Sequence, residues 1–584
     1  MLYSEIVGVY ERIEATTKRL EMTDYLVELF KSTPREIIDK VVYLTQGKLY
    51  PDYVNIELGI GEKLCLKALA FASGINEKEL EKVWKKTGDL GTAAFETIAK
   101  RHQTALFFTP LTVTRVYNNF EKIAKATGSG AQELKIKLIA ELLHDSEPKE
   151  AKYIIRSVLG KLRLGIADMT ILDALAIAFA DKKEREELER AYNICSDLGT
   201  VAKTVAEKGV EDVKKVSIKI GVPVRMMLAE RLTSVKEIIE KLGRAVYEYK
   251  YDGLRIQAHI DGKKISLFSR HLENITAQFP DLQQSLKVSF KSENGIVEGE
   301  CVPVNINTNE LLPFQEVAHR RGRKYEVKEA SADYPVVLFL FDCLYENGKD
   351  LTKESYLARR KILEKIITPS EQIRFAEYLI TDKIEEIDDF FCKAVEAGCE
   401  GLVAKSIKED SFYRAGARGW QWIKYKRDYK SEMVDTVDLV AVGAFVGKGR
   451  RAGTYGALLM GCYNKEKDVL ETVCKLASGF DDETLFKLPE MFKDSVISKP
   501  HARVSSQIKA DYWFVPKYVL EVLGAEITLS PVHTCAYNAV RKGSGLAIRF
   551  PRFTGRLRKD KAPEDATTSK EIEEMYKKQL KKAG

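Results

Sequence analysis

The residues from Glu248 to Arg255 combine the side chains that a nucleophilic amine site needs. Lys250 lies between two tyrosines on an expected strand, an Asp-Gly turn follows at Asp252-Gly253, and Arg255 comes two residues later. A lysine amine loses its proton near neutral pH when burial or nearby positive charge lowers its pKa. An arginine holds phosphate oxygens in a bidentate fork. The run therefore predicts a lysine nucleophile beside a phosphate-binding arginine, although an exposed β-hairpin with a D-G turn would have the same sequence.

Further charged and aromatic motifs follow the lysine in order. The pattern K-x-D-G-x-R resembles the lysine signature of the covalent nucleotidyltransferases, which are the ATP- and NAD-dependent polynucleotide ligases and the mRNA capping enzymes. The later motifs resemble those of the same family, and their collinear order is much more specific than any one of them. These motifs are Phe268-Ser-Arg270, Val297-Glu-Gly-Glu300, Phe339-Leu-Phe341-Asp-Cys-Leu-Tyr345, Glu400-Gly-Leu-Val-Ala-Lys405, Arg418 and Trp422-Ile-Lys424-Tyr-Lys426.

The resemblance implies a role for each residue. Lys250 would bond to AMP taken from ATP, Glu248 would accept a hydrogen bond from the adenine amino group, and Phe341 would stack on the adenine ring. Glu300 would contact the ribose or a metal, and Glu300 and Glu400 would hold Mg²⁺, a cation that prefers oxygen ligands. The cationic residues expected to bind nucleotide or nicked-strand phosphates are Arg255, Arg270, Arg418, Lys424 and Lys426.

Taken singly, several of these residues also have ordinary structural interpretations. Glu300 or Glu400 alone is typical of a surface carboxylate, and Phe341 ends an apolar run typical of a buried strand. Lys424 and Lys426 alternate along an expected strand, so both would also suit a solvated face. The joint occurrence of the motifs favours the site.

Residues 1–215 are predicted to form an all-α domain. The motif D-L-G-T occurs at Asp89 and again at Asp197, which indicates a faint internal repeat. Its helix N-termini are expected either to face phosphates or simply to be capped. The segment Lys152–Gly165 resembles the helical DNA-binding domain of archaeal and eukaryotic ATP-dependent DNA ligases, which implies DNA contacts by Arg156, Lys161 and Arg163.

Two further domains are predicted after the helical one. Residues 216–430 alternate strand and helix patterns, which indicates an α+β nucleotidyltransferase domain with antiparallel sheets. Residues 431–584 contain short strands, among them an expected strand at Val519–Ile527, and a charged terminal helix. In this context a C-terminal β-barrel of the oligonucleotide-binding (OB) type is expected.

Composition is that of a soluble globular protein of 584 residues with a net charge of +7, which permits nucleic-acid binding without requiring it. Nine cysteines without any C-x-x-C spacing predict reduced thiols in the cytoplasm and no structural zinc. We see no signal peptide and no apolar run long enough for a membrane span, and we expect a monomer.

One more motif suggests a protein partner. The segment from Gln103 to Phe108 resembles the binding box for a sliding clamp, although it is one residue short. A buried amphipathic helix is the other interpretation of this segment.

Together these features resemble an ATP-dependent DNA ligase that seals nicks in duplex DNA through a lysine–AMP intermediate, during replication, repair and recombination. An mRNA capping guanylyltransferase and an RNA ligase share the lysine motif, but neither needs the long helical region before it. An NAD-dependent ligase would carry a four-cysteine zinc module. A non-catalytic DNA-binding clamp with a degenerate ligase fold is the remaining alternative, and Lys250, Glu300, Glu400 and Lys424 argue against it because a dead site would be free to lose them.

Overall fold

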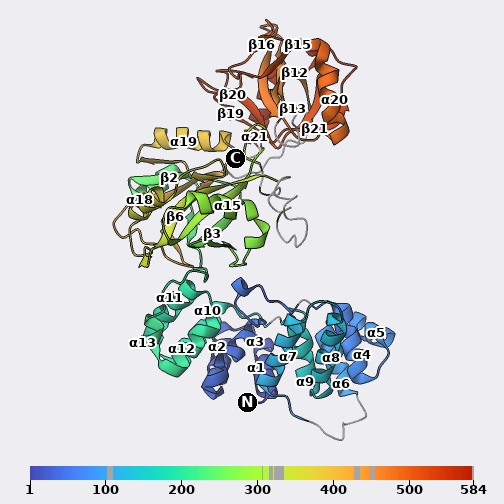
Figure 1. Cartoon of the computed structure of the whole chain (residues 1–584), viewed down its shortest axis with the longest axis vertical. Helices are drawn as coiled ribbons and strands as arrows, with labels where there is room; N and C mark the ends of the chain where they lie inside the picture. The colour runs from blue at the N-terminus through green and yellow to red at the C-terminus, as the bar shows by residue number, and fades with distance from the viewer. Residues whose placement is uncertain are drawn as a thin grey trace. The chain divides into compact units, whose positions relative to one another are not determined.

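The computed structural model describes residues 1–58, 60–100, 109–162, 164–305, 307–312, 314, 320, 334–426, 435–447 and 454–581. These residues form two compact units, one of residues 1–226 with 268–274 and one of residues 227–267 with 275–584 (Figure 1). Within the described part of the chain, every helix is too short or too polar to cross a membrane. The bounds of the three predicted domains stay predictions, because the second unit contains both strand-rich parts.

The first unit is helical, as predicted, and has one continuous apolar core. Its helices are α1 (Tyr3–Glu14), α2 (Arg19–Ser32), α3 (Ile38–Gln46), α4 (Glu62–Ser73), α5 (Glu77–Thr87), α6 (Leu90–Ala99), α7 (Val113–Lys125), α8 (Ala131–His144), α9 (Pro148–Val158), α10 (Asp168–Phe179), α11 (Arg185–Cys195), α12 (Leu198–Lys208) and α13 (Val210–Lys214).

The two D-L-G-T motifs begin α6 and α12 in the same way. Asp89 accepts hydrogen bonds from the backbone N–H and the hydroxyl of Thr92, at 2.9 and 2.8 Å. Asp197 accepts the equivalent bonds from Thr200, at 3.0 and 2.6 Å. Each aspartate therefore satisfies amide groups that a helix N-terminus leaves free. The capping interpretation of these motifs is confirmed.

The glycine of each motif allows a close helix contact. A Cβ atom at Gly91 would lie 2.7 Å from Cγ of Arg156 on α9, and one at Gly199 would lie 2.4 Å from Cζ of Tyr43 on α3. No Cβ atom fits at these distances, so alanine there would force the helices apart. The repeat thus places an aspartate cap and a packing glycine at the start of two helices.

The second unit begins with two sheets, one of five strands and one of six. The first has the order β1 (Leu228–Arg231), β11 (Arg418–Lys426), β10 (Gly401–Ser406), β2 (Ala245–Lys250) and β9 (Tyr378–Thr381). The second has the order β4 (Lys264–Ser269), β3 (Leu254–Asp261), β5 (Asn294–Pro303), β6 (Val336–Glu346) and β7 (Lys349–Asp350), with β8 (Ile373–Phe375) beside β6. Pairing is antiparallel except between β1 and β11 and between β6 and β8.

Among the described residues, the helices beside these sheets are α14 (Val235–Leu242), α15 (Pro280–Ser289), α18 (Tyr356–Ile366) and α19 (Ile384–Glu396). The turn at Asp252-Gly253 does not close a hairpin, because β2 pairs with β9 and β10 whereas β3 pairs with β4 and β5. The hairpin alternative is therefore wrong. Gly253 is needed because a Cβ there would lie 2.4 Å from the carbonyl oxygen of Cys301. The turn carries the chain from one sheet to the other, so Lys250 ends a strand of the first and Arg255 lies near the start of a strand of the second.

The C-terminal part is strand-rich and consistent with an OB fold, so the predicted fold class is confirmed. The expected strand Val519–Ile527 is in fact two strands, β18 (Val519–Leu523) and β19 (Glu526–Ser530). Strand β18 pairs with β12 (Val437–Val446) and β21 (Arg552–Leu557), whereas β19 pairs with β20 (Gly545–Arg549). Gln579 of the terminal helix bonds both the N–H and the C=O of Ile527, at 2.9 and 3.0 Å. The elements are β12 (Val437–Val446), β13 (Tyr455–Asn464), β14 (Val469–Leu476), α20 (Asp482–Phe492), β15 (Val496–Ile497), β16 (Val504–Ser505), β17 (Tyr512–Phe514), β18 (Val519–Leu523), β19 (Glu526–Ser530), β20 (Gly545–Arg549), β21 (Arg552–Leu557) and α21 (Ser569–Lys581).

Candidate active site around Lys250

The register of the five-stranded sheet aligns the predicted residues in rows. Gly401 of β10 is the partner of both Lys250 on β2 and Lys426 on β11. Val403 likewise lies between Glu248 and Lys424. Directly opposed residues in antiparallel strands project to the same face. The sheet therefore brings four predicted site residues, Glu248, Lys250, Lys424 and Lys426, to one face.

Lys250 is in direct contact with a carboxylate. Its Nζ forms an ion pair with Oε2 of Glu400, and both side chains are about one-fifth exposed, at 23% and 22%. The Nζ of Lys426 lies 3.9 Å from the same oxygen. Glu400 is held because its N–H donates to the carbonyl of Lys250 at 2.8 Å. The structure thus joins the first motif to the later E-G and lysine motifs.

The glycine after Glu400 has a physical reason. Gly401 has a φ of 143°, a conformation that disfavours side chains. A Cβ there would also lie 2.4 Å from the carbonyl oxygen of Tyr425 on the neighbouring strand. Glycine therefore lets β10 begin immediately after Glu400, close against the neighbouring strand.

Two more carboxyl groups share this environment. The pKa of Glu300 is raised to about 7, chiefly by burial, with Lys250 and Arg255 opposing the shift and Glu400 and Asp252 adding to it. Burial also raises the pKa of Asp252, with Glu400 adding to the effect. Negative charge thus gathers near one lysine amine, an arrangement that favours a proton or a cation.

Arg255 is held by protein groups. Its guanidinium donates to the carbonyl of Met227 and to Oε2 of Glu298, both at 2.7 Å. The hydroxyl of Tyr413 donates to the same Glu298 oxygen at 3.0 Å. The guanidinium carbon lies 5.4 Å from the ring centroid of Phe341. Arg255 therefore has a fixed position beside the predicted base-stacking residue.

Glu248 is buried and surrounded by donors. The hydroxyl of Tyr356 contacts its Oε1, and Nζ of Lys405 lies 2.5 Å from its Oε2. Lys405 Nζ also lies 4.5 Å from the ring centroid of Phe341, which is half-buried, and 4.5 Å from that of Trp422. Burial lowers the pKa of Lys405. The structure therefore adds Lys405 to the site.

Sequence reasoning did not select Lys405 as a site residue, although it ends the motif that begins at Glu400. Its alternation with Gly401 and Val403 was the available signal, since it predicts that all three share a face. Tyr356, Glu298 and Tyr413 were missed as well. Glu298 could have been found from its alternation with Glu300, whereas the two tyrosines had no local signal.

Two predicted arginines are exposed. Arg418 is the first residue of β11, and Arg270 directly follows β4. Neither has a hydrogen bond or an ion pair with the other predicted site residues that the structure describes. Their roles stay predictions.

The residues predicted to bind DNA have different environments. Arg156 is buried, donates to Asp89 Oδ2 from two nitrogens at 2.9 and 2.8 Å, and also contacts Glu14. This position gives it a structural role that the sequence did not reveal. Lys161 is exposed and forms an ion pair with Glu62 at 2.7 Å. Arg163 and the predicted clamp-binding segment, 103–108, lie outside the described residues.

Comparison with known proteins identifies the family. Residues 2–176, 226–426 and 451–561 match the families described as "DNA ligase N terminus", "ATP dependent DNA ligase domain" and "ATP dependent DNA ligase C terminal region". The chain is 55% identical to "DNA ligase 2" of Thermofilum pendens, with 100% of this chain and 98% of that protein covered. It is 53% identical to "DNA ligase" of Sulfophobococcus zilligii, covering 99% and 97%, and 50% identical to "DNA ligase" of Staphylothermus marinus, covering 100% of both. The chain therefore belongs to the ATP-dependent DNA ligases.

Proposed function

We propose that this ligase seals nicks in duplex DNA by carrying AMP on Lys250. A bond forms between Nζ and the α-phosphorus of ATP while the bond to pyrophosphate breaks. The AMP then passes to the 5′-phosphate at the nick, and the adjacent 3′-hydroxyl attacks that phosphate and releases AMP. Such transfers depend on in-line geometry and on neutralised charge more than on covalent chemistry by the protein.

The main support for this proposal is the alignment of Lys250, Gly401 and Lys426 on three neighbouring strands. It places the amine against Glu400 and leaves a position without a side chain between the two lysines. Lys426 brings a second cationic group to within 3.9 Å of the shared Glu400 oxygen. We infer that the α-phosphate binds above Gly401, where Lys424 and Lys426 neutralise its charge. Arg270 and Arg418 would contact the outer phosphates or the DNA strand.

The nucleoside would lie against the same face of the sheet. Phe341 is half-buried and would stack on adenine, and Glu248 would accept from its amino group. Arg255, fixed beneath Phe341 by Glu298, and Glu300 would face the ribose and phosphates. Base–aromatic stacking contributes about 1–3 kcal/mol per base, enough to orient a nucleotide.

Mg²⁺ fits the carboxylates of the site. Glu300 and Glu400 offer oxygen ligands, and burial and neighbouring carboxylates raise the pKa values of Glu300 and Asp252, which a bound cation would lower. When bound, such an ion neutralises phosphate charge. No ready-made cluster of three or more ligand residues occurs in the described part of the chain. We infer that phosphate oxygens complete the coordination.

The helical unit would bind the nicked duplex, with Lys161 as one contact to phosphate. The segment from Gln103 to Phe108 would bind a sliding clamp, and the enzyme would act as a monomer in the cytoplasm during replication, repair and recombination. The free thiols of all nine cysteines suit a reducing compartment. A clamp pull-down that Phe107→Ala with Phe108→Ala leaves unchanged would remove the clamp assignment.

The proposal is tested by incubating the full chain with Mg²⁺ and labelled ATP, GTP or NAD, followed by mass mapping of the modified residue. We expect an adenylyl group on Lys250 from ATP alone. Lys250→Ala should abolish labelling yet still seal pre-adenylylated nicks weakly, whereas Lys264→Ala, an exposed lysine of β4, should be labelled normally. Labelling that survives Lys250→Ala would mean another nucleophile, and labelling by GTP would favour a capping activity.

A further inference from the structure

Helix α18 supplies buried side chains to the rear of the site. Ser355 caps the helix by accepting from the N–H of Ala358, and Tyr356, Arg359 and Arg360 follow it in the first two turns. All three are buried. The nucleotide transfer proposed above uses none of them. Burying a polar or charged side chain costs free energy unless its donors and acceptors are hydrogen-bonded. The contacts of these three residues therefore show what each of them holds in place.

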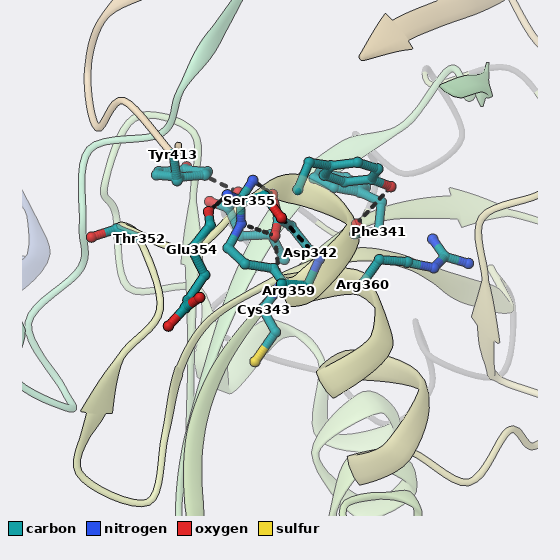
Figure 2. Close-up of polar contacts among 12 residues, drawn as sticks. Phe341, Asp342, Cys343, Thr352, Glu354, Ser355, Arg359, Arg360 and Tyr413 are labelled. Carbon is teal, nitrogen blue, oxygen red and sulfur yellow. Dashed lines mark hydrogen bonds and ion pairs between the residues drawn. The ribbon is translucent and has the colours of Figure 1, made fainter. Parts of the chain in front are cut away.

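Arg359 fixes the strand that carries Phe341. Its guanidinium donates to both oxygens of Asp342, at 2.7 and 2.9 Å, and both side chains are fully buried (Figure 2). It also donates to the carbonyls of Glu354 and Ser411, at 2.6 and 3.1 Å. A bidentate pair of this kind fixes direction as well as distance. Because Asp342 follows Phe341 directly, the pair holds the backbone of the predicted stacking residue.

Tyr356 and Arg360 act instead on Glu248. The Tyr356 hydroxyl contacts Oε1 and also lies 3.5 Å from the carbonyl of Phe341. Nη1 of Arg360 lies 3.5 Å from the same Oε1, while its Nη2 donates to the carbonyl of Ala376 at 3.0 Å. Nζ of Lys405 lies 2.5 Å from Oε2, the other oxygen of the Glu248 carboxylate. Two oxygens of an ionised carboxylate offer about four lone-pair positions. The Tyr356 hydrogen bond and the Arg360 ion pair lie on Oε1, and the Lys405 ion pair lies on Oε2, so an acceptor position is left on Oε2.

We propose that Tyr356, assisted by Arg360, is a positioning residue for base selection, which leaves Glu248 a single acceptor position that fits the 6-amino group of adenine. A 6-oxo purine would place its carbonyl oxygen against a carboxylate that can only accept, so it would be rejected. This inference rests on the proposed role of Glu248 in binding the base. The Tyr356 hydroxyl fixes the direction of the carboxylate and does not itself touch the nucleotide.

The test compares ATP with inosine triphosphate, which has a 6-oxo group, as donors for labelling of Lys250 in the full chain with Mg²⁺. We expect the parent chain to prefer ATP. Tyr356→Phe keeps the ring but loses the donor, so its preference for ATP should fall about tenfold, because a hydrogen bond to a charged group is lost. The loss should appear in the apparent KM for ATP, with the maximal rate within about twofold of the parent.

Two further variants separate positioning from a general structural effect. Tyr43→Phe removes a buried hydroxyl bond to Asp197, 2.7 Å long, in the helical unit, and should lower thermal stability without changing the preference. Arg360→Lys keeps the charge but loses the fork, and should reduce the preference about threefold. If Tyr356→Phe does not fold, the ATP preference of Arg360→Lys decides whether the positioning role holds.

The outcomes are distinct. An ATP preference unchanged within twofold in a folded variant would overturn the role of Tyr356 while leaving the proposed function intact. An equal fall in maximal rate for both nucleotides would do the same, because it indicates general damage to the site. Failure of the parent chain to be labelled on Lys250 by either nucleotide would instead overturn the proposed function, and this inference with it.

Discussion

The helical unit and the site around Lys250 both contain groups of opposite charge, but their carboxyl groups behave in opposite ways. In the helical unit, burial raises the pKa of Asp89, yet hydrogen bonds from Arg156 and Thr92 leave it lowered overall. The pKa of Glu14 is lowered in the same way, against burial, by Lys152, Tyr153 and Arg156. At the site, burial and neighbouring carboxylates leave the pKa values of Glu300 and Asp252 raised.

The difference separates structural charge from functional charge. A cluster that neutralises itself stabilises the fold and has nothing left to offer a ligand. A cluster with excess negative charge around a lysine is unbalanced until a cation or a substrate completes it. By this criterion we expect Arg156 to stabilise the helical unit and the carboxylates near Lys250 to serve a ligand, while the predicted DNA contact of Arg156 stays a prediction.

Removing Arg156 should have the largest effect on stability. Arg156→Ala leaves Asp89, which is half-buried, without its cation, whereas Glu14 keeps Lys152, and we expect a loss of about 3 kcal/mol in the free energy of unfolding. Denaturant unfolding measures it. Labelling of Lys250 by ATP, assayed well below the unfolding midpoint, should be unchanged.

The matched control for this experiment is Lys161→Ala, whose exposed pair with Glu62 is worth about 0–1 kcal/mol. Unchanged stability in Arg156→Ala combined with weaker DNA binding would contradict the comparison. It would return Arg156 to the DNA-binding role that its sequence motif implied.

Glu150 in α9 is an exception within the helical unit, because it is buried and forms no ion pair with the residues that the structure describes. Burial raises its pKa from 4.5 to about 7. The folded state therefore holds a proton that the unfolded state releases, and stability should fall as the pH rises from about 4.5 to 7. Glu150→Gln should be more stable than the parent at pH 8, by up to about 3 kcal/mol, and similar to it at pH 4. Thermal unfolding at the two pH values measures this, with exposed Glu133→Gln as the control; a parallel shift at both pH values would refute it.

Phe341→Ala tests whether the aromatic ring of the site serves a ligand or the core. We expect nucleotide binding to weaken by about 1–3 kcal/mol, the range for loss of one stacked base, with DNA binding much less affected. Equilibrium titrations with ATP and with nicked DNA measure both. Equal losses for the two ligands would indicate a purely structural role.

A packing glycine and an exposed helix glycine should give the smallest effects. Gly199→Ala would force a Cβ atom against the ring of Tyr43, and we expect a loss of about 1–3 kcal/mol. Gly8 of α1 has nothing within 4 Å of a built Cβ, so Gly8→Ala should gain about 1 kcal/mol from helix propensity. Denaturant unfolding compares the two, and a stabilised Gly199→Ala would mean that the helices separate easily.

Much of the central region could be predicted from the sequence. The strands that carry Lys250, Glu300, Phe341 and Lys424 were expected, because each has local alternation or an apolar run between turns. The single strand expected at Val519–Ile527 was wrong, since a break there depends on pairing with two different sheets. Burial of Arg156 could not be recognised from its basic motif, because its partners Asp89 and Glu14 are far away in the chain.

By itself the sequence determined which lysine lies in the nucleotidyltransferase motif, the order of the other motifs and the sequence of helical, mixed and strand-rich regions. Those features depend on residue types and spacing within a few positions. The tertiary structure alone decided which groups meet, because contacts such as Lys250 with Glu400, 150 residues apart, and Glu248 with Tyr356, 108 residues apart, depend on strand register and helix packing. Local periodicity determines the face of a strand on which a side chain lies, whereas only the assembled sheet determines which other side chains it contacts.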